Sequence, residues 1–366
     1  MTTGVYLDWN ATTPPLAEVV EVMAATARTA WGNPASVHGS GRAARDVVET
    51  AREEIALLVG ASARDVIFTS GGTEANNLAL HRAPALVTSQ LEHPSVTRVA
   101  EALEAEGRPV RWLPVPSSGC LAAEAVTEAL NELPPGAVVA VAAANHETGV
   151  IQPLEAIAAA TARAGARLHV DAVQAVGKLP AATLALADTL SLAAHKIRGP
   201  KGIGALVHRP ERAPKPLLLG GSQERGRRPG TVDPVAAAGF RVAAAWARAT
   251  QTQRGPLAEL RDRLELELTR RGGLVNGAEA PRLGHVSNLS FPGRAGDELV
   301  AALDLLGVAV SSGSACSAGT TEASKIISAM LGVPRARAAV RISLGDTTTG
   351  QDVERALAAF ERVLRA

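Results

Sequence analysis

Aromatic side chains and cysteines are scarce in this sequence of 366 residues. Phe, Trp and Tyr together make up 2% of the chain, so the core must be packed mainly from Ala, Val, Leu and Ile. The cysteines are Cys120 and Cys316, and two cysteines do not make a disulfide framework in a chain this long. No CxxC pair suggests a metal site. We therefore expect a protein with reduced thiols, as in the cytoplasm.

The sequence also lacks a large net charge, a long apolar run and clustered metal ligands. A formal net charge of +1 gives no reason to expect binding to nucleic acid or to a membrane surface. No apolar stretch is long enough to span a bilayer, and the first residues have no basic region followed by an apolar run. The eight histidines are scattered without ligand spacing, so we predict no metal site.

What is present is an alternation of short apolar runs with amphipathic segments. The helical pattern is clearest over residues 38–59, where apolar residues share one face and Gly60 gives a stop signal. Repeated strand, helix and strand favour an α/β fold with a largely parallel sheet covered by helices on both faces. Strands are predicted at 66–69, 85–89, 110–113, 138–142, 168–170, 189–192 and 204–207, and further helices at 94–106 and 153–164.

The pattern changes after about residue 230, where two long helical stretches, 234–249 and 256–271, begin a mixed segment. We predict a large domain over residues 14–251 and a smaller α+β domain built from residues 1–13 and 252–366. The elements expected in the smaller domain are strands at 285–291, 308–311 and 340–344 and helices at 297–306, 321–331 and 351–364.

Two charged residues follow predicted strands, where α/β sheets bind ligands. Lys196 comes just after an apolar strand, and desolvation there favours the neutral, nucleophilic amine that forms a Schiff base. Asp171 could pair with a cationic ring nitrogen, as a pyridoxal cofactor requires, and Gln174 could reach the same ligand. Each charge also has an ordinary explanation: Lys196 as a surface lysine in a loop, and Asp171 as a helix N-cap.

Three further segments contain groups suited to a ligand or to sulfur chemistry. A strand, a Gly-Gly turn and a helix start place Gly72 and Thr73 where their N–H groups would bind an anion, although such turns also occur with nothing bound. His93 could stack on a cofactor ring and shuttle protons, although a lone histidine is more often structural. Cys316 lies in the run SSGSACSAG, which predicts a mobile loop and a reactive thiol, whereas Cys120 is typical of a turn before a helix.

Taken in order along the chain, these segments resemble the cysteine desulfurases of the NifS and IscS type. The resemblance extends from Tyr6 to about Gly345. It implies fold type I of the pyridoxal-phosphate enzymes, in the class V aminotransferase branch, with pyridoxal 5′-phosphate as cofactor. The segments are YLDWNATTP, GNPASVHGSGR, SGGTE, EHP, NHETG, HVDAVQ, HKIRGPKGIG, QERGRRPGT, SSGSAC and RISLG.

The resemblance implies a role for each residue that matches a family motif. Lys196 matches the lysine that holds the cofactor covalently, Cys316 matches the nucleophile that takes the sulfur, and His93 matches the catalytic, ring-stacking histidine. The cofactor-binding residues implied in this way are Gly72, Thr73, His93, Asn145, His146, Asp171, Gln174, His195, Lys196 and Thr231.

Substrate and partners are implied in the same way. L-Cysteine is the substrate, Arg341 matches the arginine that grips its carboxylate, and Asn33 matches a further substrate contact. Thr231 matches a threonine that reaches the phosphate from a partner subunit, which implies a homodimer. The products are alanine and a persulfide, which passes to an acceptor protein such as an iron–sulfur scaffold. Two positions depart from the family pattern: His146 replaces an Asn, and Ala193 replaces a phosphate-binding Ser.

Three other functions stay open on these residues. A selenocysteine lyase would share almost all of them, and relative activity on the two amino acids would separate it from a desulfurase. A class V transaminase would keep Lys196 and Asp171 but would have no use for Cys316. A docking scaffold with vestigial catalysis would account for His146 and Ala193.

Overall fold

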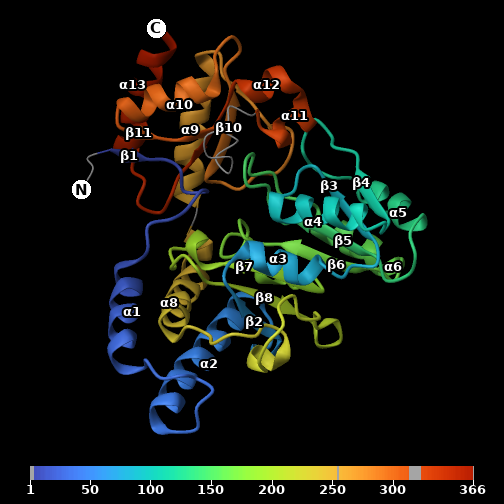
Figure 1. Ribbon diagram of the computed structural model, residues 1–366. Helices are drawn as coiled ribbons and strands as arrows, with labels where there is room; N and C mark the ends of the chain where they lie inside the picture. The colour runs from blue at the N-terminus through green and yellow to red at the C-terminus, as the bar shows by residue number, and fades with distance from the viewer. Residues whose placement is uncertain (1–3, 254, 313–322, 366) are drawn as a thin grey trace.

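A seven-stranded sheet forms the centre of the computed structural model, which describes residues 4–253, 255–312 and 323–365 (Figure 1). Neighbouring strands are parallel except for the two pairs that β8 makes, which are antiparallel. The strand order is β2 (Val66–Thr69), β8 (Gly204–His208), β7 (Thr189–Ala193), β6 (Arg167–Asp171), β5 (Val138–Ala142), β3 (Leu86–Ser89) and β4 (Val110–Leu113).

The predicted α/β architecture is therefore confirmed, with β8 as an exception to parallel pairing. Only residues 194–203 connect β7 to β8, and a parallel crossover needs a dozen or more residues, usually with a helix. The chain instead turns back beside β7. That short return contains Lys196, so the lysine is held between two paired strands.

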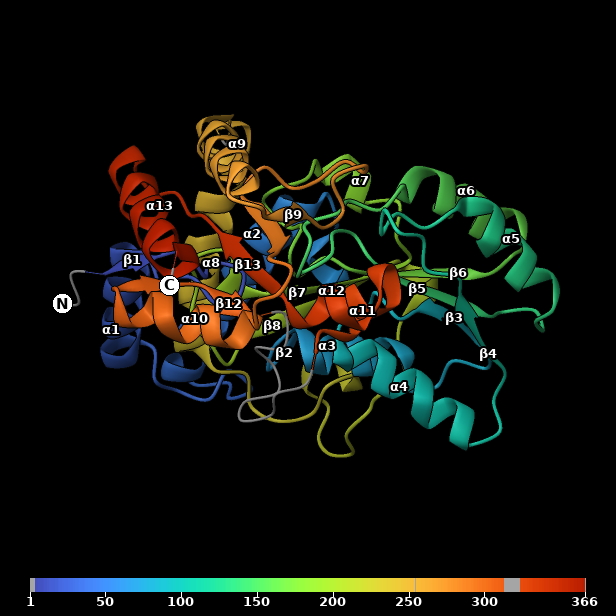
Figure 2. The ribbon, with the colours of Figure 1, turned by 90° about the horizontal axis from the view of Figure 1, so that it is seen from above.

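Helices cover both faces of this sheet (Figure 1, Figure 2). One face is covered by α3 (Gly72–Leu80) and α4 (Pro94–Ala105), and the opposite face by α5 (Ala123–Asn131), α6 (Leu154–Arg163) and α7 (Ala181–Leu184). Three further helices pack on one another beside the sheet: α1 (Ala17–Thr29), α2 (Gly39–Val59) and α8 (Pro234–Thr250). The core between these layers consists mainly of Ala, Val, Leu and Ile, as the low aromatic content predicts.

A smaller group of elements contains both chain ends and has its own core, centred on Leu264, Phe291 and Phe360. Its four-stranded antiparallel sheet has the order β12 (Ser311–Ser312), β13 (Ala339–Ser343), β10 (Val286–Ser290) and β9 (Leu274–Val275). The other elements are β1 (Val5–Tyr6), which pairs with β11 (Val308–Ala309), and helices α9 (Gly255–Arg270), α10 (Gly296–Leu305), α11 (Lys325–Leu331), α12 (Val333–Arg337) and α13 (Gly350–Arg365). The predicted boundaries between the large and the small domain, after residues 13 and 251, stay a prediction.

The predicted strand at 308–311 is split between two sheets. Val308–Ala309 pairs with β1, whereas Ser311–Ser312 pairs with β13, so the chain changes sheets at Val310. The sequence does not predict helix α1, because the segment gives little indication of where a helix would begin. Its N-cap residue, Leu16, has no side chain that could cap the helix. Within the described residues, no helix is long and apolar enough to cross a membrane.

Candidate active site

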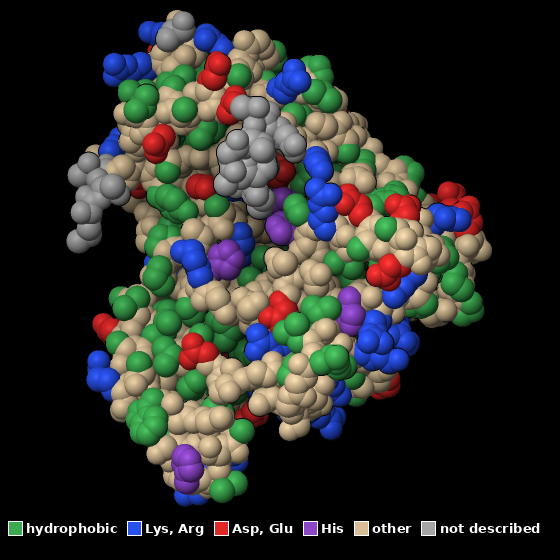
Figure 3. Space-filling model, viewed as in Figure 1, with side chains coloured by type: hydrophobic (Ala, Val, Ile, Leu, Met, Phe, Trp, Pro, Cys, Tyr) green, Lys and Arg blue, Asp and Glu red, His purple; other side chains and the backbone are tan. Residues whose placement is uncertain are grey.

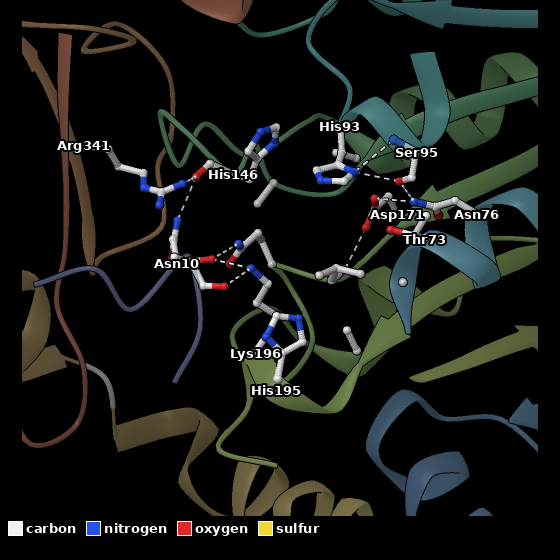
Figure 4. A pocket seen from close by; sticks show the side chains of 17 residues that line it. Asn10, Thr73, Asn76, His93, Ser95, His146, Asp171, His195, Lys196 and Arg341 are labelled. Carbon is white, nitrogen blue, oxygen red and sulfur yellow. Dashed lines mark hydrogen bonds between the residues drawn. The ribbon is translucent and has the colours of Figure 1, made fainter. Parts of the chain in front are cut away.

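A pocket of about 310 Å³ opens at the carboxyl ends of β5, β6 and β7 (Figure 4). Ligands bind at this edge of parallel sheets because loops and helix N-termini converge there. In the space-filling view the surface is hollowed between the two groups of elements, with histidine and cationic side chains in the hollow (Figure 3). The pocket is lined by Asn10, Ala11, Gly72, Thr73, Asn76, His93, Ser95, Ala142, Ala144, His146, Asp171, Val173, Gln174, Ala193, His195, Lys196 and Arg341.

Most of the predicted site residues lie together in this lining, but four do not. Asn145 is buried outside the pocket, where its side-chain oxygen Oδ1 accepts the backbone N–H groups of Glu147 and Thr148 and so holds the turn. Asn33 and Thr231 do not line the pocket of their own chain. Cys316 lies outside the described residues.

Lys196 points into the pocket from the short helical turn that follows β7 (Figure 4). Its Nζ donates hydrogen bonds to the backbone oxygens of Asn10, at 2.5 Å, and Ala11, at 2.8 Å. Both acceptors belong to the segment between β1 and α1. The amine therefore links this early segment of the chain to the turn that follows β7. A surface lysine in a loop, the alternative explanation, does not describe this position.

Asp171, at the end of β6, is 7% exposed, and both of its carboxylate oxygens accept hydrogen bonds. One carboxylate oxygen accepts the backbone N–H of Val173, as an N-cap residue would, at 3.0 Å. The other accepts a hydrogen bond from Asn76 Nδ2 at 2.8 Å. The carboxylate nevertheless lines the pocket, where it is available to a cationic ring nitrogen.

Gly72 and Thr73 form the N-terminal turn of α3, and no side chain caps this helix. Its first N–H groups therefore point toward the pocket without a capping acceptor, which favours an anion. A side chain at position 72 would not fit, because a Cβ there would lie 2.6 Å from Val173 Cγ2. An anion site, a buried carboxylate and a lysine amine in one pocket fit the phosphate, ring nitrogen and aldehyde of pyridoxal phosphate.

The pocket histidines are held neutral mainly by burial. Burial lowers the pKa of His93, where the nearby Asp171 charge opposes this effect and Lys196 adds to it. The pKa of His146 falls well below its usual value because of burial and then the neighbouring His93, Arg341 and Lys196. The two rings meet edge to face, 5.4 Å apart.

Arg341, on β13, brings a guanidinium from the smaller group of elements into the pocket. It is 4% exposed, and it donates to Asp8 Oδ1 at 2.7 Å and to the backbone oxygen of His146 at 3.1 Å. Its Nε has no hydrogen-bond partner among the described residues. A buried N–H donor without an acceptor can donate a hydrogen bond to the carboxylate of a small substrate.

Sequence reasoning missed three polar residues that line the pocket: Asn10, Asn76 and Ser95. Asn10 lies inside the segment YLDWNATTP, whereas Asn76 and Ser95 lie just after the segments SGGTE and EHP. Asn76 contacts the Asp171 carboxylate and Ser95 Oγ, and only the fold brings these residues together. Ser95 also contacts His93, which lies two positions before it.

Glu92, next to His93, makes protein stability depend on pH. It is 4% exposed, and burial, followed by the charge of Asp171, raises its pKa to about 8. Because the folded protein holds this proton more tightly than the unfolded chain, the proton's contribution to stability is complete below about pH 4.5 and is lost as pH rises to about 8.

Glu92→Gln should remove this pH-dependent loss of stability, which is on the order of 4 kcal/mol, as measured by urea unfolding at several pH values. Equal pH slopes in the parent and the variant would contradict the assignment, and Glu104→Gln, on the exposed side of α4, is the control.

Comparison with known proteins gives the family. The model of the class-V aminotransferase family matches residues 5–356. This chain belongs to the class-V aminotransferases. Pyridoxal phosphate, the cofactor expected from the resemblance, is the cofactor of this family, in agreement with the pocket chemistry.

Relatives of this class-V aminotransferase cover nearly its whole length. It is 41% identical to the cysteine desulfurase of Cereibacter sphaeroides, over 96% of this chain and 94% of that protein. It is also 41% identical to the IscS-like cysteine desulfurase of Mycobacterium tuberculosis, with the same coverage. Among solved structures, a NifS-like protein matches with a TM-score of 0.90 and 32% identity over 99% of this chain and all of that one.

Proposed function

We propose that this class-V aminotransferase is a cysteine desulfurase, which removes sulfur from L-cysteine and leaves L-alanine and a persulfide on Cys316. The observation that carries the proposal is the joint placement of Lys196, Asp171 and Arg341 around one pocket with an anion site at Gly72 and Thr73. The names of several relatives that are similar over nearly the whole chain point to the same reaction.

The chain's own residues divide the work as follows. Pyridoxal phosphate, when bound, supplies an electron sink for the bond that breaks at the substrate Cα. Lys196 Nζ would hold the cofactor and move the proton of the substrate Cα, and the Asp171 carboxylate would hold a proton at the ring nitrogen. Arg341 binds the carboxylate of L-cysteine. The thiolate of Cys316 then attacks the substrate sulfur, so that an S–S bond forms and the C–S bond breaks, its electron pair staying with the carbon skeleton. Alanine forms once Cβ is protonated and a proton is returned to Cα.

The decisive experiment is to incubate the purified protein with L-cysteine and to measure alanine together with sulfide or persulfide. Alanine with sulfur release is the expected result. A selenocysteine lyase would release alanine much faster from selenocysteine, a transaminase would transfer the amino group to a keto acid, and a docking scaffold would release no alanine. We propose that the sulfur passes to an acceptor protein, an iron–sulfur scaffold or a similar carrier in the cytoplasm.

We further propose a symmetric homodimer in which Thr231 reaches the partner's phosphate site. Thr231 is exposed in its own chain, at the end of a loop that is anchored at two points. Glu224 forms a buried ion pair with Arg52, at 2.7 Å, and Arg228 bonds to Glu74 in the first turn of α3, at 2.8 Å. A loop fixed in this way presents Thr231 outward in a defined position, as a contact with a second subunit requires.

Thr231→Val should weaken binding of pyridoxal phosphate about tenfold, because one hydrogen bond to a charged phosphate is lost while side-chain volume is kept. Fluorescence titration of the cofactor-free protein measures this affinity. Mixed dimers of Thr231→Val and Lys196→Ala chains should regain one site of parental affinity, since that site takes Lys196 from one chain and Thr231 from the other. This arrangement would be refuted if solution scattering showed a monomer and that monomer bound the cofactor with full affinity.

A further inference from the structure

A continuous chain of hydrogen bonds joins His93 to Asp171 along the wall of the pocket (Figure 4). Ser95 Oγ lies 2.8 Å from His93 Nδ1, and Asn76 Nδ2 lies 2.8 Å from Ser95 Oγ. The same Asn76 nitrogen lies 2.8 Å from Asp171 Oδ2. All four residues line the pocket, and they come from α3, the start of α4 and the end of β6.

The direction of each hydrogen bond follows from the groups at its ends. A carboxylate only accepts, so the Asn76 amide must turn its NH₂ group toward Asp171. The second proton of that NH₂ group is donated to Ser95 Oγ, which leaves the serine hydroxyl proton for His93 Nδ1. Asn76 Oδ1 accepts from His169 Nε2 at 3.0 Å, so every polar atom of the amide is used.

His93 Nδ1 also accepts the backbone N–H of Ser95 at 3.1 Å, because His93 is the N-cap residue of α4. Two donors therefore point at this ring nitrogen, and a proton on Nδ1 would face both of them. The imidazole proton is left to Nε2. We propose that Ser95 and Asn76 are positioning residues, which hold His93 as the neutral Nε2–H tautomer and tie its orientation to the Asp171 carboxylate.

The charges around His93 act in opposite directions on its protonation. The Asp171 carboxylate raises the pKa of His93, whereas burial and the Lys196 ammonium lower it, and the net change is downward. The edge-to-face ring of His146 is itself held neutral and adds no charge. The two donors on Nδ1 add to the downward effect, since they stabilise the neutral ring.

This assignment has a chemical consequence that rests on the proposed function. With Nδ1 occupied and the proton on Nε2, His93 offers a bound cofactor or substrate an N–H donor and no free lone pair. It therefore acts as a neutral hydrogen-bond donor in the pocket and not as an imidazolium acid. Asn76 adds a second effect, because its NH₂ group and the Val173 N–H fix both oxygens of Asp171.

Nuclear magnetic resonance of ¹⁵N-histidine-labelled protein tests the proposal without turnover. Long-range ¹H–¹⁵N spectra distinguish the two neutral tautomers and the imidazolium, and the His93 signals are those lost in His93→Asn. In protein with and without pyridoxal phosphate, we expect neutral His93 to carry its proton on Nε2 and to gain a second proton only at a lower pH than an ordinary histidine does. A protonated Nδ1 at neutral pH would overturn the proposal.

Ser95→Ala separates positioning from simple packing. It removes the hydroxyl donor but leaves the backbone N–H of the helix cap, so we expect the pKa of His93 to rise by about 1 and Ser95→Thr to restore it. Thr97→Val, which removes a hydroxyl from the same helix outside this chain of bonds, should leave His93 unchanged. A parental His93 titration in Ser95→Ala would overturn the proposal. Absence of alanine release with these spectra intact would count only against the desulfurase function.

Discussion

Lys196→Ala should abolish the visible absorption that pyridoxal phosphate gains when it bonds covalently to the protein, while the chain stays folded. Among the described residues that line the pocket, Lys196 is the one with a primary amine. Its removal forfeits hydrogen bonds to two backbone oxygens of the segment between β1 and α1, at an expected cost of about 1–3 kcal/mol. The fold should tolerate that loss, so absorbance spectra and circular dichroism will report separate effects.

Lys201→Ala is the matched control for this prediction. Lys201 lies five residues further along the same return between β7 and β8, is exposed, and does not line the pocket. Borohydride reduction followed by peptide mass spectrometry should place the cofactor on Lys196 in the parent and in Lys201→Ala. The assignment is wrong if Lys201→Ala loses the absorption band while Lys196→Ala retains it.

Residues at strand ends were the part of the site that could be predicted from the sequence. Asp171 and Lys196 each follow a short apolar run, and parallel strands bring such positions to one edge of the sheet. The local pattern therefore fixes where these side chains lie before any long-range contact is known. The same argument identified the glycine turn at Gly72, because a glycine pair between strand and helix is a local feature.

Asn76, Ser95 and Asn10 could not be found in this way. Asn76 and Ser95 lie within helices, where a polar residue is most often solvated, and their importance comes from contact with each other and with Asp171, 95 positions away from Asn76. Asn10 lies in an irregular segment that pairs with residues near both the middle and the end of the chain. Such contacts are tertiary, and no sequence period signals them.

The split of the predicted strand at 308–311 has the same kind of cause. Apolar character predicts that the segment is buried and extended. Both halves are extended, and the first residue of each is buried. Which sheet each half joins depends on partners, β1 for one and β13 for the other, which lie far away in the sequence. The split also affects the site, because β12 places Ser311 opposite Arg341 in the antiparallel register.

The described residues on either side of the Cys316 segment, Ser311 and Ser324, contact pocket residues or their chain neighbours. Ser311, before it, pairs with pocket residue Arg341, and Ser324, after it, caps α11 and donates to the buried Glu147 at 2.5 Å. Glu147 is the neighbour of pocket residue His146. Cys316 itself lies outside the described residues.

Cys316→Ser should retain the bound cofactor and still bind L-cysteine, but alanine production should fall roughly a thousandfold or more, as losses of a nucleophile do. In the proposed mechanism, cofactor binding and Cα proton removal depend on Lys196 and Asp171, whereas sulfur transfer requires a thiolate that both attacks the substrate sulfur and carries it away. Mass spectrometry after incubation with L-cysteine should show a persulfide in the parent and none in the variant.

Cys120→Ser should behave like the parent in both measurements. Cys120 is half-buried before α5, and burial raises the pKa of its thiol, so little of it is thiolate at neutral pH. A transaminase with this pocket would need neither cysteine, and its activity would survive both substitutions. Alanine release from L-cysteine at the parental rate by Cys316→Ser would therefore refute the desulfurase mechanism, because no other residue in the chain is assigned to accept the sulfur.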